Sequence, residues 1–126
     1  MPFTNLAQFK RGAVVLIPFP FTDLSNSKLR PAVLISDPAA CSGAVDGHFV
    51  FLTTQQPPAH LPAISVMEGS RAATAMGLRF PIGVRVAHVL PTKLATLEVA
   101  LVQKQIGAAP AEILDQVLAI LAPALG

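Results

Sequence analysis

Two basic side chains near the end of a polar stretch are the clearest candidates for binding an anion. Arg30 directly precedes Pro31, which restricts its backbone. Its guanidinium could hold a phosphate through two hydrogen bonds and stabilise negative charge on the phosphate oxygens. An ordinary surface arginine at the end of a strand is the alternative interpretation. Lys28 could attract a phosphate backbone, or could be only a solvated loop lysine.

Aromatic rings lie close to these basic residues in the sequence. Phe19 and Phe21 flank Pro20, ahead of a polar stretch at 22–28 that is typical of a surface loop. A ring exposed there could stack on a nucleic-acid base. Core packing is the better interpretation for Phe19, whereas Phe21 could serve either purpose.

Groups that could exchange a proton are scarce. His48 and His88 stand on mostly apolar segments, where a lone histidine is more often structural, and Glu68 lies in an expected loop. The single cysteine, Cys41, excludes an intrachain disulfide and every multi-cysteine metal site. A reducing, cytoplasmic location is therefore expected.

Short apolar segments bounded by glycine or proline must position these side chains. Runs rich in β-branched and aromatic residues predict buried strands, and the alternation of apolar residues after Pro81 predicts one more. The expected strands span residues 12–19, 31–35, 48–54, 63–67 and 82–88. Arg30 would then directly precede the second strand.

The rest of the chain is expected to form loops, short helical turns and one terminal helix. Residues 39–41 could form one helical turn, and 68–77 is predicted to be a mobile loop. The segment 93–107 is ambiguous and favours a helical turn at 98–101 followed by a strand at 102–106. Pro110 suits the first turn of an amphipathic helix, which Pro123 and Gly126 would close.

The expected elements, together with the length and composition, indicate one mainly β domain with a C-terminal amphipathic helix. The elements favour a small, twisted, partly closed barrel, and 126 residues suit a single domain over 1–126. A hydrophobic content of 52% excludes a disordered chain, and 12 prolines with 8 glycines argue against an all-helical bundle. The net charge of +2 is too weak for general attraction to nucleic acid, so such binding would need a local patch.

No segment has the ~20 apolar residues that a membrane-spanning helix needs. Lys10 and Arg11 precede an apolar run at 13–19 and imitate the start of a signal peptide, but Pro18 and Pro20 break that run. We therefore expect no association with a membrane.

Two stretches of the sequence resemble the MazF/PemK toxin family. The first is RGAVVLIPFPFTD at 11–23, followed by KLRPAVLIS at 28–36. The second is KLATLE at 93–98, followed by Leu101, Lys104, Ile106 and Gly107, and the terminal helix lies where the family's last helix lies. The resemblance is strong at both ends of the chain and loose between 55 and 92.

The resemblance implies an SH3-like barrel that forms a homodimer and cleaves single-stranded RNA without a metal or other cofactor. In such an mRNA interferase the ribose 2′-hydroxyl attacks the phosphate and a 2′,3′-cyclic phosphate remains. The resemblance also implies a cognate antitoxin protein that occupies the RNA groove. Recognition of the RNA sequence would reside in the loops at 22–29 and 55–62.

Individual functional residues carry over only in part. Arg30 matches the family's catalytic arginine, and Thr53 matches its catalytic threonine at a strand end, with Thr54 as the second choice. Arg85 offers an arginine on a late strand, but Ala87 stands where some members have an aspartate, and aligning from Lys93 puts Thr92 there instead. Neither alignment supplies a carboxylate, so His48, His88 and Glu68 are the remaining candidates for the general base.

A non-catalytic module on the same barrel is the competing hypothesis. Such a protein could be a degenerate toxin that binds antitoxin or nucleic acid, or could resemble the gyrase-poisoning toxins that share the architecture. The missing carboxylate and the low net charge favour this alternative. The pairing of Arg30 with Thr53 disfavours it.

Overall fold

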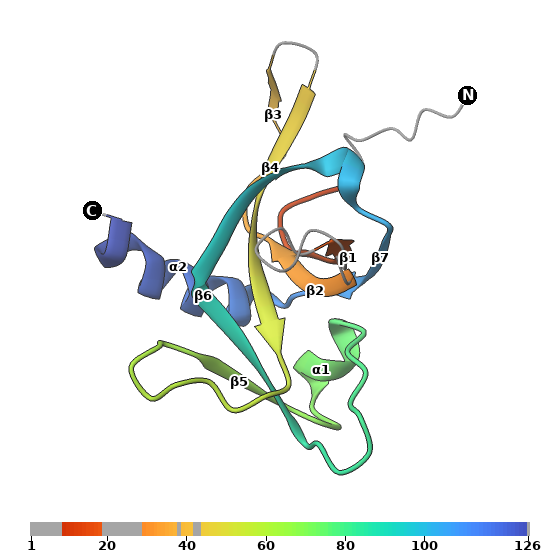
Figure 1. Ribbon diagram of the computed structural model, residues 1–126, viewed down its shortest axis with the longest axis vertical. Helices are drawn as coiled ribbons and strands as arrows, with labels where there is room; N and C mark the ends of the chain where they lie inside the picture. Colours follow the sequence, from red (N-terminus) through yellow and green to blue (C-terminus); the bar gives the residue numbers. More distant parts are fainter. Residues whose placement is uncertain (1–8, 19–28, 38, 42–43, 126) are drawn as a thin grey trace.

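The computed structural model describes residues 9–18, 29–37, 39–41 and 44–125, and its strands form one antiparallel sheet. Along the sheet the order is β5-β6-β4-β2-β1-β7, and β3 pairs with the outer part of β4. The strands are β1 (Ala13–Pro18), β2 (Leu29–Leu34), β3 (Ala39–Cys41), β4 (Ala44–Thr53), β5 (Ile64–Met67), β6 (Val86–Glu98) and β7 (Lys104–Ala108). The sheet curls strongly, so that β7 returns toward the middle of the molecule (Figure 1).

Three helices lie within the described residues. They are α1 (Arg71–Ala75), the 3-10 helix η2 (Val99–Leu101) and the C-terminal α2 (Ala111–Leu125). The helix α2 packs chiefly against β6, and α1 lies near the end of the sheet where β7 and β5 approach it (Figure 1). The mainly β fold with a C-terminal helix that the sequence predicts is confirmed.

Strand residues are buried on both faces of the sheet, which explains why the strands are continuous apolar runs in the sequence. On one face, Val14, Val33 and Val50 pack with the inner side of α2. On the other face, Val15 and its neighbours pack with η2 and form a second cluster. Members of this second cluster include Ile17, Ala32, Leu34, Phe49, Phe51 and Ala95.

The structure corrects four expectations drawn from the sequence. Residues 39–41 form the strand β3 and not a helical turn. The strand expected at 82–88 begins only at Val86, because Gly83, with φ of +85°, completes a turn in which Val84 N–H bonds the carbonyl of Pro81. This strand, β6, then continues to Glu98 and so includes residues 93–98 of the ambiguous segment. The terminal helix includes Pro123 and runs to Leu125.

The fourth correction concerns the predicted loop at 68–77, part of which is α1. Its N-cap is Ser70, whose hydroxyl accepts a hydrogen bond from Ala73 N–H. At the other end, Gly77 has a φ of +67°, Gly77 N–H bonds the carbonyl of Thr74, and Leu78 N–H bonds that of Ala73. This is a Schellman motif, which fixes the direction of the chain beyond the helix. The turn predicted at 98–101 is confirmed as η2, and the strand expected at 102–106 is β7, shifted by two residues.

No helix among the described residues is long and apolar enough to cross a membrane.

Candidate functional site

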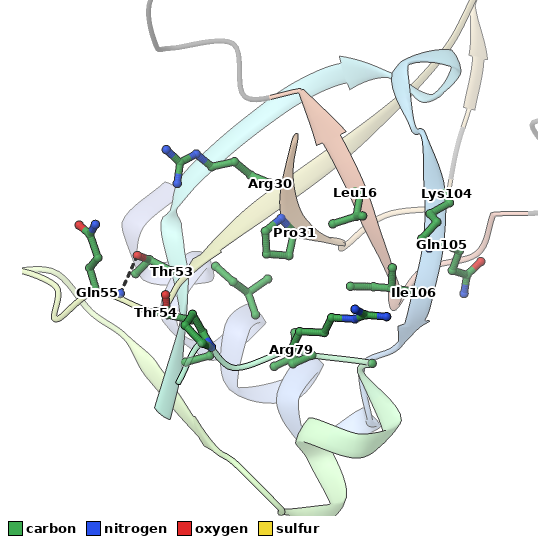
Figure 2. Close-up of a pocket in the computed structure, with 15 residues that line it drawn as sticks. Leu16, Arg30, Pro31, Thr53, Thr54, Gln55, Arg79, Lys104, Gln105 and Ile106 are labelled. Atoms are coloured by element: carbon green, nitrogen blue, oxygen red, sulfur yellow. Dashed lines mark hydrogen bonds between the residues drawn. The ribbon is translucent and has the colours of Figure 1, made fainter. Parts of the chain in front are cut away.

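A cavity of about 760 Å³ opens at the end of the curled sheet where β2, β4 and β7 converge with the segment after α1. Its polar lining residues are Arg30, Thr53, Thr54, Gln55, Arg79, Lys104 and Gln105. Its other lining residues are Leu16, Pro31, Leu52, Gly77, Leu78, Pro81, Ala87 and Ile106. Figure 2 shows these side chains around an open centre, with polar groups on two sides.

Arg30 and Thr53 come from neighbouring strands and lie on the same side of this cavity (Figure 2). In the β2–β4 pair, Ala32 stands opposite Phe51. The paired residues end at this position, and the same antiparallel spacing extended by two residues would place Arg30 opposite Thr53. Arg30 is half-buried and also pairs with Ile17 on β1, which is fully buried. The arginine is therefore held on a rigid strand and not on a loop.

The hydroxyl of Thr53 is oriented by its own backbone. Its Oγ1 accepts a hydrogen bond from Gln55 N–H at 3.0 Å, which Figure 2 shows as a dashed line. A threonine hydroxyl has one proton to donate and two lone pairs to accept with. Because this bond uses only a lone pair, the O–H of Thr53 can still donate to an anion in the cavity.

The opposite side of the cavity carries two further cations, Arg79 and Lys104 (Figure 2). Lys104 lies on β7 opposite Leu16 of β1, and Arg79 follows the Schellman motif of α1. Both side chains are exposed. The sequence alone points to no role for either, although Lys104 belongs to the late motif that resembles the toxin family.

A close packing of two glycines sets the position of Arg79. A Cβ added to Gly77 would overlap the carbonyl oxygen of Ile106, and a Cβ added to Gly107 would overlap the backbone of Met76. The chain leaving α1 therefore touches β7 backbone to backbone. The signals of α1, Ser70 before it and Gly77 after it, are present in the sequence, but the contact with β7 joins segments about thirty residues apart and leaves no local signal.

The lining of the cavity is positively charged. Arg30, Arg79 and Lys104 line it, and none of the described residues that line it is an aspartate, a glutamate or a histidine. Anions are attracted to clefts lined by charge of one sign with apolar walls, because such walls focus the field. The local patch that the small net charge requires is therefore present.

The other residues singled out in the sequence have different positions. Thr54 lines the cavity, as its neighbour does. Arg85 is exposed and does not line it, and its carbonyl accepts a hydrogen bond from Glu68 N–H. Lys28 and Phe21 lie outside the described residues.

The three candidates for the general base lie at different places: His48 on β4, His88 on β6 and Glu68 in the turn after β5. Glu68 is exposed and is not part of the cavity lining. His48 is exposed on β4, with its Nδ1 2.8 Å from Thr96 Oγ1. His88 is buried with 6% of its surface exposed, and it pairs directly with Thr53 on one side and with Ser65 on the other. Of the three, His88 is therefore the one that adjoins Thr53 in the strand register.

Ser65 also contacts the His88 side chain, its Oγ lying 3.5 Å from Nδ1. His88 thus pairs with a hydroxyl-bearing residue on each neighbouring strand, Thr53 on β4 and Ser65 on β5. Within the described part of the chain, no group of three or more His, Cys, Asp or Glu side chains could hold a metal ion.

Fold and cavity together define a small protein with one curled antiparallel sheet, a C-terminal helix and a cationic pocket at the open end of the sheet. A family model described as the PemK-like, MazF-like toxin of type II toxin–antitoxin systems matches residues 10–125. The chain belongs to this family.

Solved structures support the fold. The chain is similar to two crystal forms of MazE-MazF from Deinococcus radiodurans, Form-III with a TM-score of 0.59 and Form-II with a TM-score of 0.54. In each case the identity is 22%, and the match covers 94% of this chain and 96% of the other. No curated protein matches the chain in sequence.

Proposed function

We propose that this toxin is an endoribonuclease that cuts single-stranded RNA without a metal ion. The observation that carries the proposal is that Arg30 and Thr53, from the neighbouring strands β2 and β4, line one cavity whose charged lining residues, among those the structure describes, are all cationic. A phosphodiester held there would face a guanidinium and a hydroxyl donor on rigid backbone. These are the groups that stabilise charge on phosphate oxygens.

In the proposed reaction the ribose 2′-oxygen forms a bond to phosphorus and the bond to the 5′-oxygen of the next nucleotide breaks. The proton of the 2′-hydroxyl passes to a base, and the departing 5′-oxygen takes up a proton. Arg30 stabilises the negative charge that develops on the phosphate oxygens, and Thr53 donates its O–H to one of them. The products are a 2′,3′-cyclic phosphate and a 5′-hydroxyl.

The purified protein should cut a panel of mixed-sequence single-stranded RNAs in the presence of EDTA. Each upstream product should carry a 2′,3′-cyclic phosphate, because an internal nucleophile leaves that end, and mass spectrometry of the fragments identifies it. The same sequences made with 2′-O-methyl ribose should stay intact. Folded protein that cuts none of the RNAs would contradict the proposal.

Of the three candidate bases, His88 is the one we propose as proton acceptor, because its strand position is directly opposite Thr53, although it is not itself part of the cavity lining. His88→Gln should lower kcat about 10²-fold or more and leave KM close to that of the unmodified protein, since glutamine keeps hydrogen bonds but exchanges no proton. His48→Gln is the matched control, because His48 is exposed and its partner is Thr96. A thermal melt of each variant checks folding. An unchanged kcat in a folded His88→Gln variant would assign the proton to another group.

A non-catalytic toxin that only binds its ligands is the second candidate. The observation that favours it is the lack of a carboxylate or imidazole among the described residues that line the cavity. The two candidates differ in one readout, because a binding module holds RNA and 2′-O-methyl RNA equally and cuts neither.

We also propose a cognate antitoxin and self-association. The similar solved structures are of MazE-MazF from Deinococcus radiodurans, which supports a partner of the MazE kind for this chain. The exposed apolar side chains of Leu29 and Leu101 are consistent with a buried face between two copies. A protein that sediments as a monomer at micromolar concentration would contradict the homodimer.

A further inference from the structure

The cationic cavity has two separate charged ends. Arg30 lies at one end beside Thr53, and Arg79 and Lys104 lie across from them (Figure 2). The apolar side chains of Leu16, Pro31 and Ile106 lie between the two ends (Figure 2). A single phosphate at the Arg30 end would leave the other two cations without an anion.

The second charged end is held as firmly as the first. Lys104 is on a strand that pairs with β1, and Gln103 N–H bonds the carbonyl of Leu16 at 2.8 Å next to it. Arg79 stands two residues after Gly77, whose backbone packs directly on β7. Because both side chains project from fixed backbone, less freedom is lost when they bind an anion.

The size of the cavity indicates how much of a ligand fits between the ends. A volume of about 760 Å³ lies within the ~300–1,000 Å³ range of pockets that enclose drug-sized ligands. A lone phosphate needs only a small part of that space. A nucleobase on the apolar surface would fill the centre, and a base can reach such a surface only when it is unpaired.

We propose that Arg79 and Lys104 form a second phosphate-binding subsite of this cavity. The ligand is single-stranded RNA that spans it, with the scissile phosphate at the Arg30 end, one nucleotide over the apolar surface and a flanking phosphate at the Arg79 and Lys104 end. This subsite rests on the proposed ribonuclease function and extends it to a stated length of substrate.

The salt dependence of binding tests the subsite without requiring cleavage. A fluorescein-labelled, mixed-sequence 12-mer of 2′-O-methyl RNA serves as the probe, and fluorescence anisotropy gives Kd over a series of NaCl concentrations. Each phosphate of a single strand that a protein neutralises adds about 0.7 to the steepness of log K against log salt. The double variant Arg79→Ala/Lys104→Ala should therefore reduce the slope by about 0.7, and each single variant by part of that amount, because the two side chains share one phosphate.

Matched variants separate the subsite from general charge. Arg71→Ala removes an exposed arginine of α1 that does not line the cavity, and it should leave the slope unchanged. Arg79→Lys keeps the charge and should keep most of the slope. Since both Arg79 and Lys104 are exposed, their alanine variants are expected to fold, which a thermal melt checks. A double variant with the slope of the unmodified protein would overturn the subsite.

Failure of the subsite and failure of the ribonuclease proposal give different results. If the protein cuts RNA in EDTA and the double variant keeps its slope, the subsite is wrong and the nuclease stands. If the protein cuts no RNA but the slope of the double variant falls by about 0.7, the subsite stands and the chain is an RNA-binding module.

Discussion

Arg30→Ala should lower the rate of RNA cleavage at saturating substrate by about 10²–10³-fold. Of the cations in the described lining, Arg30 is the one on the strand beside that of Thr53, so no other described lining residue replaces it at that end of the cavity. The reduction should fall mainly on kcat, because the charge that Arg30 stabilises is largest in the transition state. Single-turnover cleavage of a labelled RNA in EDTA measures it.

Two companion variants make the Arg30 result specific. Arg30→Lys keeps the positive charge but lacks the two-pronged hydrogen bond, so it should recover only part of the rate. Arg71→Ala removes an arginine from a surface outside the cavity and should cut at the rate of the unmodified protein. Circular dichroism and a thermal melt show whether Arg30→Ala is folded. A folded variant that still cuts at the full rate would remove Arg30 from the mechanism.

Much of the frame of this site is local and can therefore be predicted from the sequence. The runs that become β1 and β2 are apolar on both faces because both faces of the sheet are covered, one by α2 and one by η2 and its neighbours. That pattern predicts strands without knowledge of any tertiary contact. The position of Arg30 next to Pro31 is equally local, because it depends on two adjacent residues.

The Arg79 side of the cavity depends on contacts between residues far apart in the sequence, which no local sequence pattern predicts. Arg79 reaches it only because Gly77 ends α1 with a left-handed residue and then packs against β7. The sequence predicts a loop there, since five helical residues are too few to show a periodic apolar face. His88 is recognisable as a lone histidine on an apolar strand, but its pairing with Thr53 follows from the shift in register between Val50 and Phe51 on β4.

Gly77 and Gly107 form the close backbone contact between the end of α1 and β7, next to Arg79. Gly77→Ala should lower the free energy of unfolding by about 4 kcal/mol, the sum of two costs. A left-handed conformation costs a residue with a side chain about 1–3 kcal/mol. Forcing a methyl group into the carbonyl oxygen of Ile106 adds an overpacking cost of about 1–3 kcal/mol. Urea unfolding followed by circular dichroism measures the decrease.

Gly83→Ala is the internal control that separates these two costs. Gly83 also has a positive φ, +85°, but an added Cβ would meet nothing within 4 Å. Its substitution should therefore cost only the conformational part, about 1–3 kcal/mol. The difference between the two variants measures the steric contact between α1 and β7. Equal destabilisation at Gly77 and Gly83 would mean that the chain can move away from β7 at no cost, and Arg79 would then have no fixed position from which to bind a phosphate.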